Sequence, residues 1–320
     1  MEVVVLGCGP SSSIPAMRCV LAGTCAVCKE AHENPQSKNR RLNPSLLVRD
    51  MRTGANIVID CGKTFRESVL RVFPQVGTRH IDAVILTHGH ADACLGLDDL
   101  REVQKFETTV DASTGERIHK PQEPMGLHCS TATQAELSGK FEYLMEKEEE
   151  KAMREANITP VPFRWVAKLQ WKLFDYFTPF NVCGLTVLPF PVVHGKGYLS
   201  SAFEFGFEFG VRVVYISDVS ELTDESREYL NDTTKPSIDV LIIDALYVKN
   251  YHSTHMNLDA VLDEIRTIRP KHTLLTGMSH EFDYSRESEL LRDISAKEGI
   301  KVEMAYDGMR LAFAEMTLQN

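Results

Sequence analysis

The sequence repeats one arrangement three times: a short apolar run ends, and a side chain able to bind a metal ion follows at once. The run 83–86 is followed by THGHAD, the run 185–193 by His194, and the run 212–216 by Ser217 and Asp218. Runs of this length and composition are typical of buried strands. Because sheet folds place ligands and catalytic groups at strand ends, we predict one site formed by these three segments.

The spacing of His88 and His90 has a physical reason. In extended backbone, residues i and i+2 project to the same side, so both imidazoles can bind one ion. Gly89 between them lets the chain turn tightly. His194 and Asp218 would complete a shell of four ligands that suits zinc, with manganese or iron as alternatives. We therefore predict a catalytic metal site at these four residues.

Further apolar runs predict one mixed α/β domain over residues 1–320. Runs at 3–6, 56–59, 240–243 and 273–275 indicate buried strands, and helical patterns cover 64–73 and 258–268. Asn257 is the expected N-cap of the second helix, and Pro270 follows its end. A helical insertion is expected at about 138–180, where residues 141–156 have the composition of a solvated surface helix. Residues 160–180 would form a lid or a dimer contact, or pack against the core, which we favour.

Charge and hydropathy exclude several classes of protein. A net charge of −10 disfavours binding to nucleic acid or to an anionic membrane. No apolar run reaches about 18 residues, so no membrane span is expected. The first residues, MEVVVLGCGP, lack the basic region of a signal peptide, so we expect a cytoplasmic protein with reduced thiols. Cys8, Cys61, Cys129 and Cys183 lie in or beside apolar runs and are expected to be buried core thiols.

THGHAD, followed by GLDDLR at 96–101, resembles the metallo-β-lactamase superfamily. Within it, the similarity is to the branch of the bacterial phosphonate-pathway cyclic phosphodiesterase and its uncharacterised relatives, with tRNA 3′-processing nucleases more distant. It covers nearly the whole chain and includes LGCGPSSSIP at 6–15, NRRLNPSLLV at 39–48, IVIDCG at 57–62, HSTHMNLDA at 252–260 and LLTGMSHEFD at 274–283. The resemblance implies a four-layer αββα sandwich with the metal site at the sheet edges.

The sequence departs from the family pattern at two expected ligands of a second metal ion. The family usually has HxHxDH, where this chain ends in Ala93, and a C-terminal histidine where this chain has Gly277. The second ion keeps only Asp92 and a share of Asp218, so we predict one tightly bound catalytic ion. Asp92 then acts as a general base that orients water, or it merely accepts backbone N–H groups. Cys94 follows the position of the missing histidine by one residue, so we do not expect it to replace that ligand.

Two histidines precede the predicted helix at 258–268. The resemblance implies a histidine here that donates a proton to the leaving oxygen. His252 fits that role better than His255, and a surface or capping role is the alternative for both. In the family, strand-end acids such as Asp60 and Asp244 mostly orient loops.

Three arginines are candidate phosphate contacts, because guanidinium groups bind oxyanions in a bidentate manner. They are Arg40, Arg41 and Arg101. Pairing with nearby acids such as Asp98 and Asp99 is an equal alternative.

Three cysteines within ten residues fit three corners of a structural zinc site, although a CxxC redox pair is the alternative. They are Cys19, Cys25 and Cys28. The phosphodiesterase that the chain resembles has such a zinc ion, closed by a histidine three residues after its C-terminal metal ligand. The corresponding residue here is His280, so the resemblance implies one structural zinc bound by these four side chains.

These features favour a metal-dependent hydrolase that cleaves a small-molecule phosphodiester, cyclic or open, through a metal-activated water. A thioester or lactone hydrolase of the same fold is the closest alternative. A non-catalytic relic that serves as a binding protein is the third hypothesis, and Ala93 and Gly277 are its support. The expected partner is a small molecule, not a membrane or nucleic acid, and a homodimer stays open.

Overall fold

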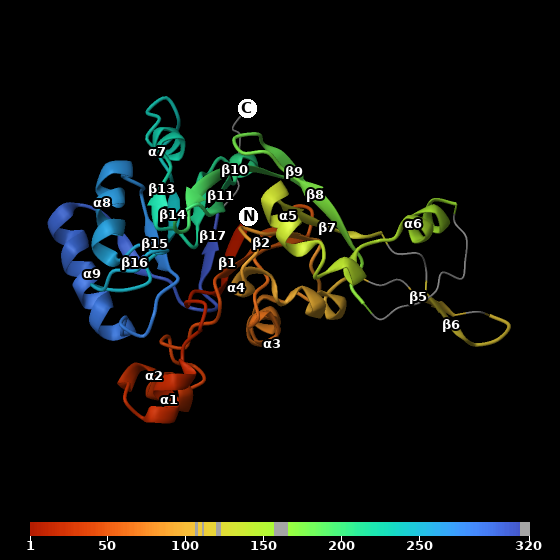
Figure 1. Cartoon of the computed structure of the whole chain (residues 1–320), viewed down its shortest axis with the longest axis horizontal. Coiled ribbons are helices and arrows are strands. Elements are labelled where there is room, and N and C mark those ends of the chain that lie inside the picture. The colour runs from red at the N-terminus through yellow and green to blue at the C-terminus, as the bar shows by residue number, and fades with distance from the viewer. Residues whose placement is uncertain (106–107, 111, 120–122, 157–165, 314–320) are drawn as a thin grey trace.

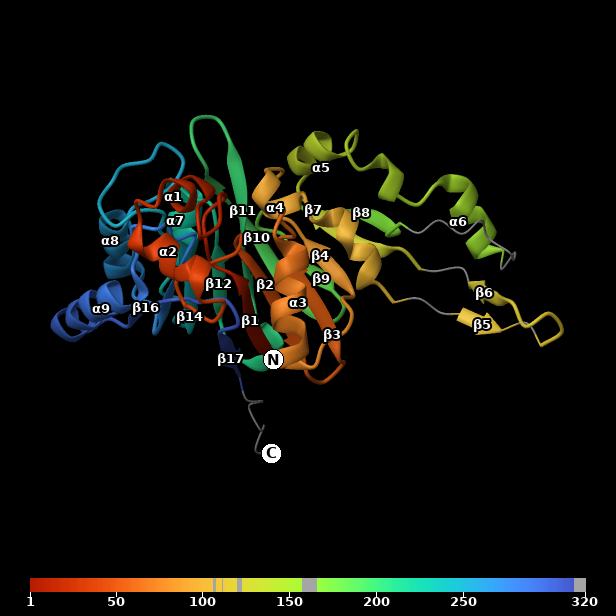
Figure 2. The same ribbon diagram turned by 90° about the horizontal axis from the view of Figure 1, so that it is seen from below.

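Two β-sheets lie face to face between outer helices in the computed structural model, which describes residues 1–105, 108–110, 112–119, 123–156 and 166–313. Figure 1 shows α8 and α9 on one side of the sheets and α3 to α5 on the other, and Figure 2 shows the same order from below. The α/β sandwich predicted from the sequence is confirmed. No helix in the described residues is long and apolar enough to cross a membrane.

The first sheet has seven strands in the order β17-β1-β2-β3-β4-β7-β8, and the second has eight, in the order β13-β10-β11-β12-β14-β15-β16 with β9 paired to β10. The first comprises β1 (Glu2–Gly7), β2 (Ser45–Asp50), β3 (Ala55–Ile59), β4 (Ala83–Ile85), β7 (Met125–Cys129), β8 (Leu169–Leu173) and β17 (Arg310–Ala312). The second comprises β9 (Phe180–Val182), β10 (Leu185–Val193), β11 (Leu199–Phe205), β12 (Val213–Ile216), β13 (Glu221–Leu222), β14 (Val240–Asp244), β15 (Thr273–Thr276) and β16 (Val302–Met304). A separate hairpin consists of β5 (Thr108–Val110) and β6 (Arg117–His119).

The α-helices are α1 (Met17–Ala22), α2 (Ala26–Glu33), α3 (Phe65–Val76), α4 (Ala91–Cys94), α5 (Thr131–Leu137), α6 (Glu148–Glu155), α7 (Asp224–Leu230), α8 (Leu258–Ile268) and α9 (Tyr284–Glu298). Short 3₁₀ helices are η1 (Leu97–Glu102), η2 (Glu142–Leu144) and η3 (Phe207–Phe209). The predicted helix at 258–268 is confirmed with its cap: Asn257 Oδ1 accepts a hydrogen bond from the Ala260 amide. The helix predicted at 64–73 continues to Val76.

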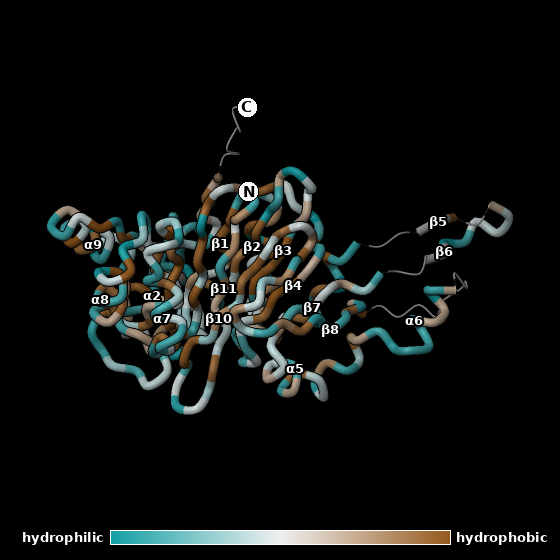
Figure 3. The backbone as a smooth tube through the Cα atoms, turned by 90° about the horizontal axis from the view of Figure 1, so that it is seen from above, coloured by the Kyte–Doolittle hydropathy of each residue, from teal (hydrophilic) through white to brown (hydrophobic). Residues whose placement is uncertain are grey.

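The continuous apolar runs of the sequence arise because the strands are buried on both faces. In β1, Val3 and Val5 point into the core between the sheets, and Val4 and Leu6 point into the core under α3. Figure 3 shows the same contrast at larger scale, with apolar residues concentrated in the strands and polar residues on the extension that carries β5, β6 and α6. Full burial of each such side chain contributes about 1.5–3 kcal/mol.

The predicted insertion at about 138–180 has mixed structure. The expected surface helix at 141–156 is divided into η2 and α6, and α6 buries no side chain. Part of the 160–180 segment, residues 157–165, lies outside the described residues. The rest packs against the body: β8 joins β7 in parallel, β9 joins β10, and Phe174 is buried in the core between the sheets.

Candidate metal centre

The ends of β4, β10 and β12, which carry the predicted ligands, lie at one edge of the sandwich. β10 and β12 run in the same direction because each is antiparallel to β11, which lies between them. β3, β4 and β7 are parallel in the first sheet, and β12, β14 and β15 are parallel in the second. A direct bond joins the sheets at this edge, where the Ser201 amide of β11 donates to the Thr87 carbonyl. The predicted ligands His88, His90 and His194 converge there, with one ring nitrogen of each lying within 4.8 Å of the other two.

A chain of hydrogen bonds sets the tautomer of His88. The Thr87 hydroxyl lies 2.9–3.0 Å from both carboxylate oxygens of Asp60 and 2.8 Å from His88 Nδ1. The hydroxyl therefore donates to Asp60 and accepts from His88 Nδ1–H, which leaves the lone pair on Nε2. That Nε2 atom is buried and has no hydrogen-bond partner among the residues that the structure describes. Burial lowers the pKa of His88 to about 3, so the ring is neutral, as a metal ligand must be.

His194 is oriented in the same way. Its Nδ1 donates to the Thr254 carbonyl at 2.8 Å, so its Nε2 carries the lone pair, and this atom lies 3.2 Å from His90 Nδ1. Tyr198 stacks on the His90 ring with the centroids 4.7 Å apart, and its hydroxyl lies 3.3 Å from the Gly89 amide. These contacts bring one ring nitrogen of each of the three histidines to one small volume, as binding of one divalent ion requires.

The sequence analysis did not include Thr87, Tyr198 or Thr254 in the site. Thr87 stands inside the THGHAD motif, and Tyr198 closely follows His194, so proximity to a predicted ligand was the available signal. Their contacts depend on tertiary structure, since Tyr198 bonds to Glu136 at 2.9 Å and Thr254 belongs to a loop 60 residues after His194.

Buried carboxyl groups surround the histidines. Burial first, and the neighbouring Asp218 second, raise the pKa of Asp92, and burial and then Asp244 raise the pKa of Asp218. Such groups destabilise one another when they are all ionised, and a cation among them would remove that repulsion. Asp218 also has a left-handed backbone with φ 51°, a conformation that concentrates at functional sites.

Asp218 forms a second potential ligand group with His194 and His255, and one donor atom of each lies within 4.8 Å of the others. Asp92 lies in neither group, although it is buried next to them.

The structure brings His255 closer to the metal ligands than His252. His255 Nδ1 lies 2.6 Å from Asp244 Oδ2 and 3.8 Å from Asp218 Oδ1. Burial alone would lower the pKa of His255, but the Asp244 carboxylate, bonded to the ring, raises it to about 9. His252 lies one ring farther out, 5.2 Å from His255 between centroids, and burial lowers its pKa. The sequence favoured His252 as the proton donor to the leaving oxygen, whereas these distances favour His255.

Asp244 occupies the space where a side chain of residue 277 would lie. A Cβ atom added to Gly277 would be 2.0 Å from Asp244 Oδ1, and the backbone there has φ 69°. Asp244 cannot swing away freely, because its other oxygen accepts bonds from His255 and from the Val219 amide at 3.2 Å. The packing around residue 277 therefore leaves no room for a histidine side chain.

Two expectations about other residues are wrong, those for Arg41 and Cys183, whereas Arg40 and Arg101 follow the alternative of pairing with acids. Arg41 is completely buried and donates to the carbonyls of Ser279 and Phe282, so it holds a loop and cannot contact a phosphate. Arg40 pairs with Glu67, and Arg101 pairs with Asp98 at 3.2 Å, as the alternative proposed. Cys183, expected in the core, is exposed because it lies in the turn before β10.

Cys94 is not placed as a ligand. Its thiol donates to the Gly89 carbonyl at 3.3 Å, and none of the potential ligand groups among the described residues includes it.

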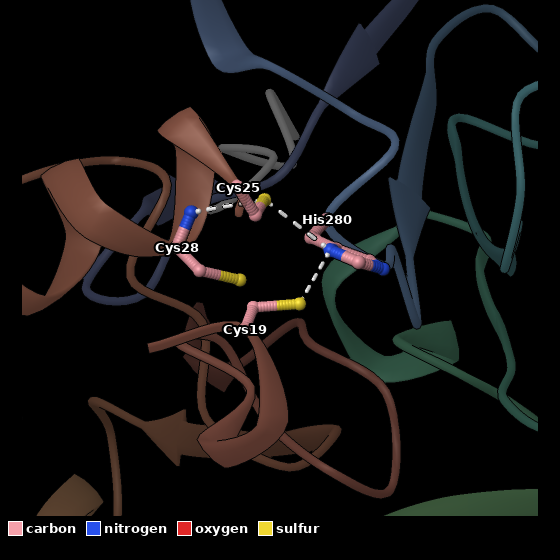
Figure 4. Close-up of side chains that lie close together, drawn as sticks. All are labelled: Cys19, Cys25, Cys28 and His280. Carbon is pink, nitrogen blue, oxygen red and sulfur yellow. Dashed lines mark hydrogen bonds between the residues drawn. The ribbon is translucent and has the colours of Figure 1, made fainter. Parts of the chain in front are cut away.

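The four predicted residues of the cysteine cluster come together from distant parts of the chain (Figure 4). His280 Nδ1 lies 3.3 Å from the Sγ atoms of Cys19 and Cys25, and all four donor atoms are within 4.8 Å of one another. Zinc bonded tetrahedrally at about 2.3 Å to sulfur and 2.0–2.1 Å to nitrogen separates such ligands by about 3.5 Å. The arrangement fits a structural zinc ion.

The hydrophobic core of this part of the chain is small. α1 and α2 form a small lobe on the body (Figure 1), and among the described residues its buried hydrophobic side chains are Ile14, Cys19, Val27, Cys28 and Ala31. Backbone amides point at the sulfur atoms, with Ala16 N 3.4 Å from Cys28 Sγ and Cys28 N 3.4 Å from Cys25 Sγ. Burial raises the pKa of Cys28 to about 12, and the bond from the Ala16 amide opposes that rise by favouring the thiolate, the form that binds zinc.

Comparisons with known proteins agree with this fold. The chain is 27% identical to a new diphosphatase from the PhnP family over 98% of each chain, with a TM-score of 0.70. The Zn²⁺-bound PqqB of Methylobacterium extorquens shares the fold at 17% identity, with 98% and 100% of the two chains covered and a TM-score of 0.67. The short form of human tRNase Z shares it at 16% identity, with the same coverage and a TM-score of 0.56.

A curated protein from Porphyromonas gingivalis named octanoyltransferase is 26% identical over 287 residues, which cover 90% of this chain. The chain spans about half of that protein, 48% of its length. A family model described as a beta-lactamase superfamily domain matches residues 55–278. This match begins at β3 and ends just past β15, so it contains every residue of the predicted catalytic site, and the chain belongs to the β-lactamase superfamily.

Proposed function

We propose that this chain is a metal-dependent hydrolase of small-molecule phosphodiesters. The observation that carries the proposal is the convergence of His88 Nε2, a buried atom without a partner, with the ring nitrogens of His90 and His194. The phosphodiester class is supported by the 27% identity, over 98% of both chains, to a diphosphatase of the PhnP family.

The ligands of the catalytic ion would be His88, His90, His194 and Asp218. A divalent ion in such a shell supplies Lewis acidity toward a phosphoryl oxygen and makes water a stronger acid. Zinc suits three imidazoles and one carboxylate, with manganese and iron as alternatives.

Two other side chains of the chain would move protons. Asp92, buried beside Asp218, would orient the attacking water and accept its proton. His255 would donate its proton to the leaving oxygen, because Asp244 and Asp218 keep its imidazole protonated at neutral pH. His252 is the outer neighbour of His255 and would act on the substrate only beyond it.

One catalytic ion per chain follows from the two departures from the family pattern. Ala93 offers no ligand, and Asp244 with His255 fills the volume beside Gly277. A structural zinc ion at Cys19, Cys25, Cys28 and His280 would bring the total to two ions per chain.

The test is hydrolysis of bis(p-nitrophenyl) phosphate by protein loaded with zinc, manganese or iron, next to protein stripped by a chelator. We expect turnover that requires the ion and falls by orders of magnitude in Asp218→Ala. Fully loaded wild type that is inert toward phosphodiesters, thioesters and lactones would favour a non-catalytic binding protein instead.

Acyl ester or thioester hydrolysis is the second candidate, because the curated relative from Porphyromonas gingivalis is named octanoyltransferase. Half of that protein lies outside the match, so its name can belong to the other half. Octanoyl thioesters and the phosphodiester should be compared on the same preparation. A larger kcat/KM for the thioester would replace the phosphodiesterase proposal.

A further inference from the structure

The connection between β14 and α8 carries both candidate proton donors. We call residues 245–257 the histidine loop, because His252 and His255 lie in it. The loop is closed at its base, where the Leu246 amide donates to the Met256 carbonyl at 2.9 Å. Its second half contacts the metal centre as described above. The positions of the two histidines therefore also depend on what holds the first half.

The first half of the histidine loop is held by a carboxylate from another part of the chain. The Val248 amide donates to Glu281 Oε2 at 3.1 Å, and Asn250 Nδ2 donates to Glu281 Oε1. The Ser279 amide donates to the Leu246 carbonyl at 3.0 Å. Both carboxylate oxygens of Glu281 are thus engaged by this loop.

Glu281 belongs to a segment that is itself fixed from the other side. We call residues 277–283, which connect β15 to α9, the His280 segment. The buried guanidinium of Arg41 donates to the carbonyls of Ser279 at 3.0 Å and Phe282 at 2.9 Å. These carbonyls lie on either side of a two-residue turn that begins at His280.

The contacts that fix the His280 segment come from the part of the chain that includes the lobe of α1 and α2. Ile14 and Arg41 exchange two backbone hydrogen bonds of 2.7 and 2.9 Å, so Arg41 is joined to the base of the lobe. His280 Nδ1 lies 3.3 Å from the sulfur atoms of Cys19 and Cys25 (Figure 4). A zinc ion in the cluster would fix His280 to the lobe, and the next residue in the sequence holds the histidine loop.

We propose that the lobe of α1 and α2 positions the histidine loop through the His280 segment, with Glu281 as the positioning residue that joins the two. An ion in the cysteine cluster then has a role beyond the lobe, because it keeps the Glu281 carboxylate where the loop binds it. The consequence for hydrolysis rests on the proposed phosphodiesterase function, whereas the consequence for the loop does not.

Amide hydrogen exchange of the zinc-loaded protein, followed by mass spectrometry without substrate, measures the loop directly. Glu281→Ala should speed exchange in residues 246–256 by about tenfold or more, as expected for loss of two hydrogen bonds to a charged group. Glu281→Gln keeps a carbonyl oxygen as acceptor and should restore part of the protection. Glu289→Ala, at an exposed glutamate of α9, is the control and should exchange as wild type does.

The role of the ion is tested in the same assay. Cys25→Ser should speed exchange in residues 277–283 and in the histidine loop. If that variant does not fold, His88→Ala combined with His90→Ala takes its place, because the cluster ion is then the one that remains. Removal of that ion by a chelator should speed exchange in the same two segments.

Hydrolysis separates a positioning role from a merely structural one. In Glu281→Ala the zinc content should stay at about two ions per chain. The kcat for bis(p-nitrophenyl) phosphate should fall by about tenfold or more with little change in KM, because a displaced proton donor slows the chemical step.

Unchanged loop exchange in Glu281→Ala, or in protein whose cluster has lost its ion, overturns the proposal. Faster exchange with an unchanged kcat in an active enzyme also overturns it, because Glu281 would then be structural alone. If the loop responds but wild type does not hydrolyse the ester, the phosphodiesterase proposal is wrong and the link from the lobe to the loop stands.

Discussion

At the scale of the residue, His255 is the side chain whose protonation should shape the pH profile. Asp244 and Asp218 raise its pKa to about 9, so the imidazole is protonated below that pH and neutral above it. We expect the rate of phosphodiester hydrolysis to rise with pH through roughly 7, as the attacking water ionises, and to fall through about 9.

His255→Gln should abolish the fall in rate at alkaline pH, the alkaline limb of the profile. It should also lower kcat by about 10²–10⁴-fold, as expected for loss of a general acid. His252→Gln is the control: it should retain the alkaline limb. A pH profile in which His252→Gln alone loses that limb would return the proton-donor role to His252.

Gly277 offers a second prediction at the same scale. A Cβ at residue 277 would lie 2.0 Å from Asp244 Oδ1, so Gly277→Ala should displace Asp244, loosen His255 and lower kcat. Gly299→Ala is a matched control, because Gly299 has a similar φ of 66° and nothing within 4 Å of an added Cβ. Both substitutions strain the backbone by about 1 kcal/mol or more. The melting temperature of Gly299→Ala therefore measures the strain alone, and that of Gly277→Ala measures the strain together with the clash at 277.

Equal melting temperatures and equal rates for the two variants would contradict the packing described around Asp244. The same packing predicts that Gly277→His combined with Ala93→His does not create a second metal site, since the new imidazole would meet Asp244 first.

At the scale of the element, the lobe of α1 and α2 should depend on its metal ion. Its core has five buried side chains, too few to hold the segment, whereas a zinc ion supplies folding free energy directly. Cys25→Ser should lose about one zinc ion per chain and melt at a lower temperature than His88→Ala. Cys183→Ser, at an exposed cysteine outside the cluster, should leave zinc content and melting temperature unchanged.

The strands could be predicted because burial on both faces leaves runs of valine and isoleucine in the sequence. The helix at 258–268 could be predicted because its apolar residues recur at helical spacing between Asn257 and Pro270. The runs of valine and isoleucine also marked His88, His90, His194 and Asp218, since each follows such a run. Arg41 could not be placed, because a buried guanidinium bonded to the carbonyls of residues more than 230 positions away has no local pattern. The choice between His252 and His255 depended on Asp244, which tertiary structure alone brings to 2.6 Å.

At the scale of the whole molecule, elemental analysis should find about two zinc-like ions per purified chain. One belongs to the cysteine cluster and one to the histidines. His88→Ala combined with His90→Ala should reduce the count to one while the protein stays folded, because the fold rests on the large hydrophobic core between the sheets and not on this ion. Three ions in wild type would show that a second catalytic ion binds without the two missing histidines.

Asp218 and Asp60 have a left-handed backbone, with φ 51° and 64°, which lowers the stability of the fold at residues of the proposed active site. A residue other than glycine in that conformation costs of order 1–3 kcal/mol, and here the carboxylates are also buried among like charges. Asp218→Gly should therefore melt higher than metal-free wild type, although it cannot bind the ion. Selection for thermal stability alone would therefore replace the aspartate at residue 218, because the substitution stabilises the fold while it abolishes metal binding. At 277, where φ is 69°, the chain already has the glycine that its backbone prefers.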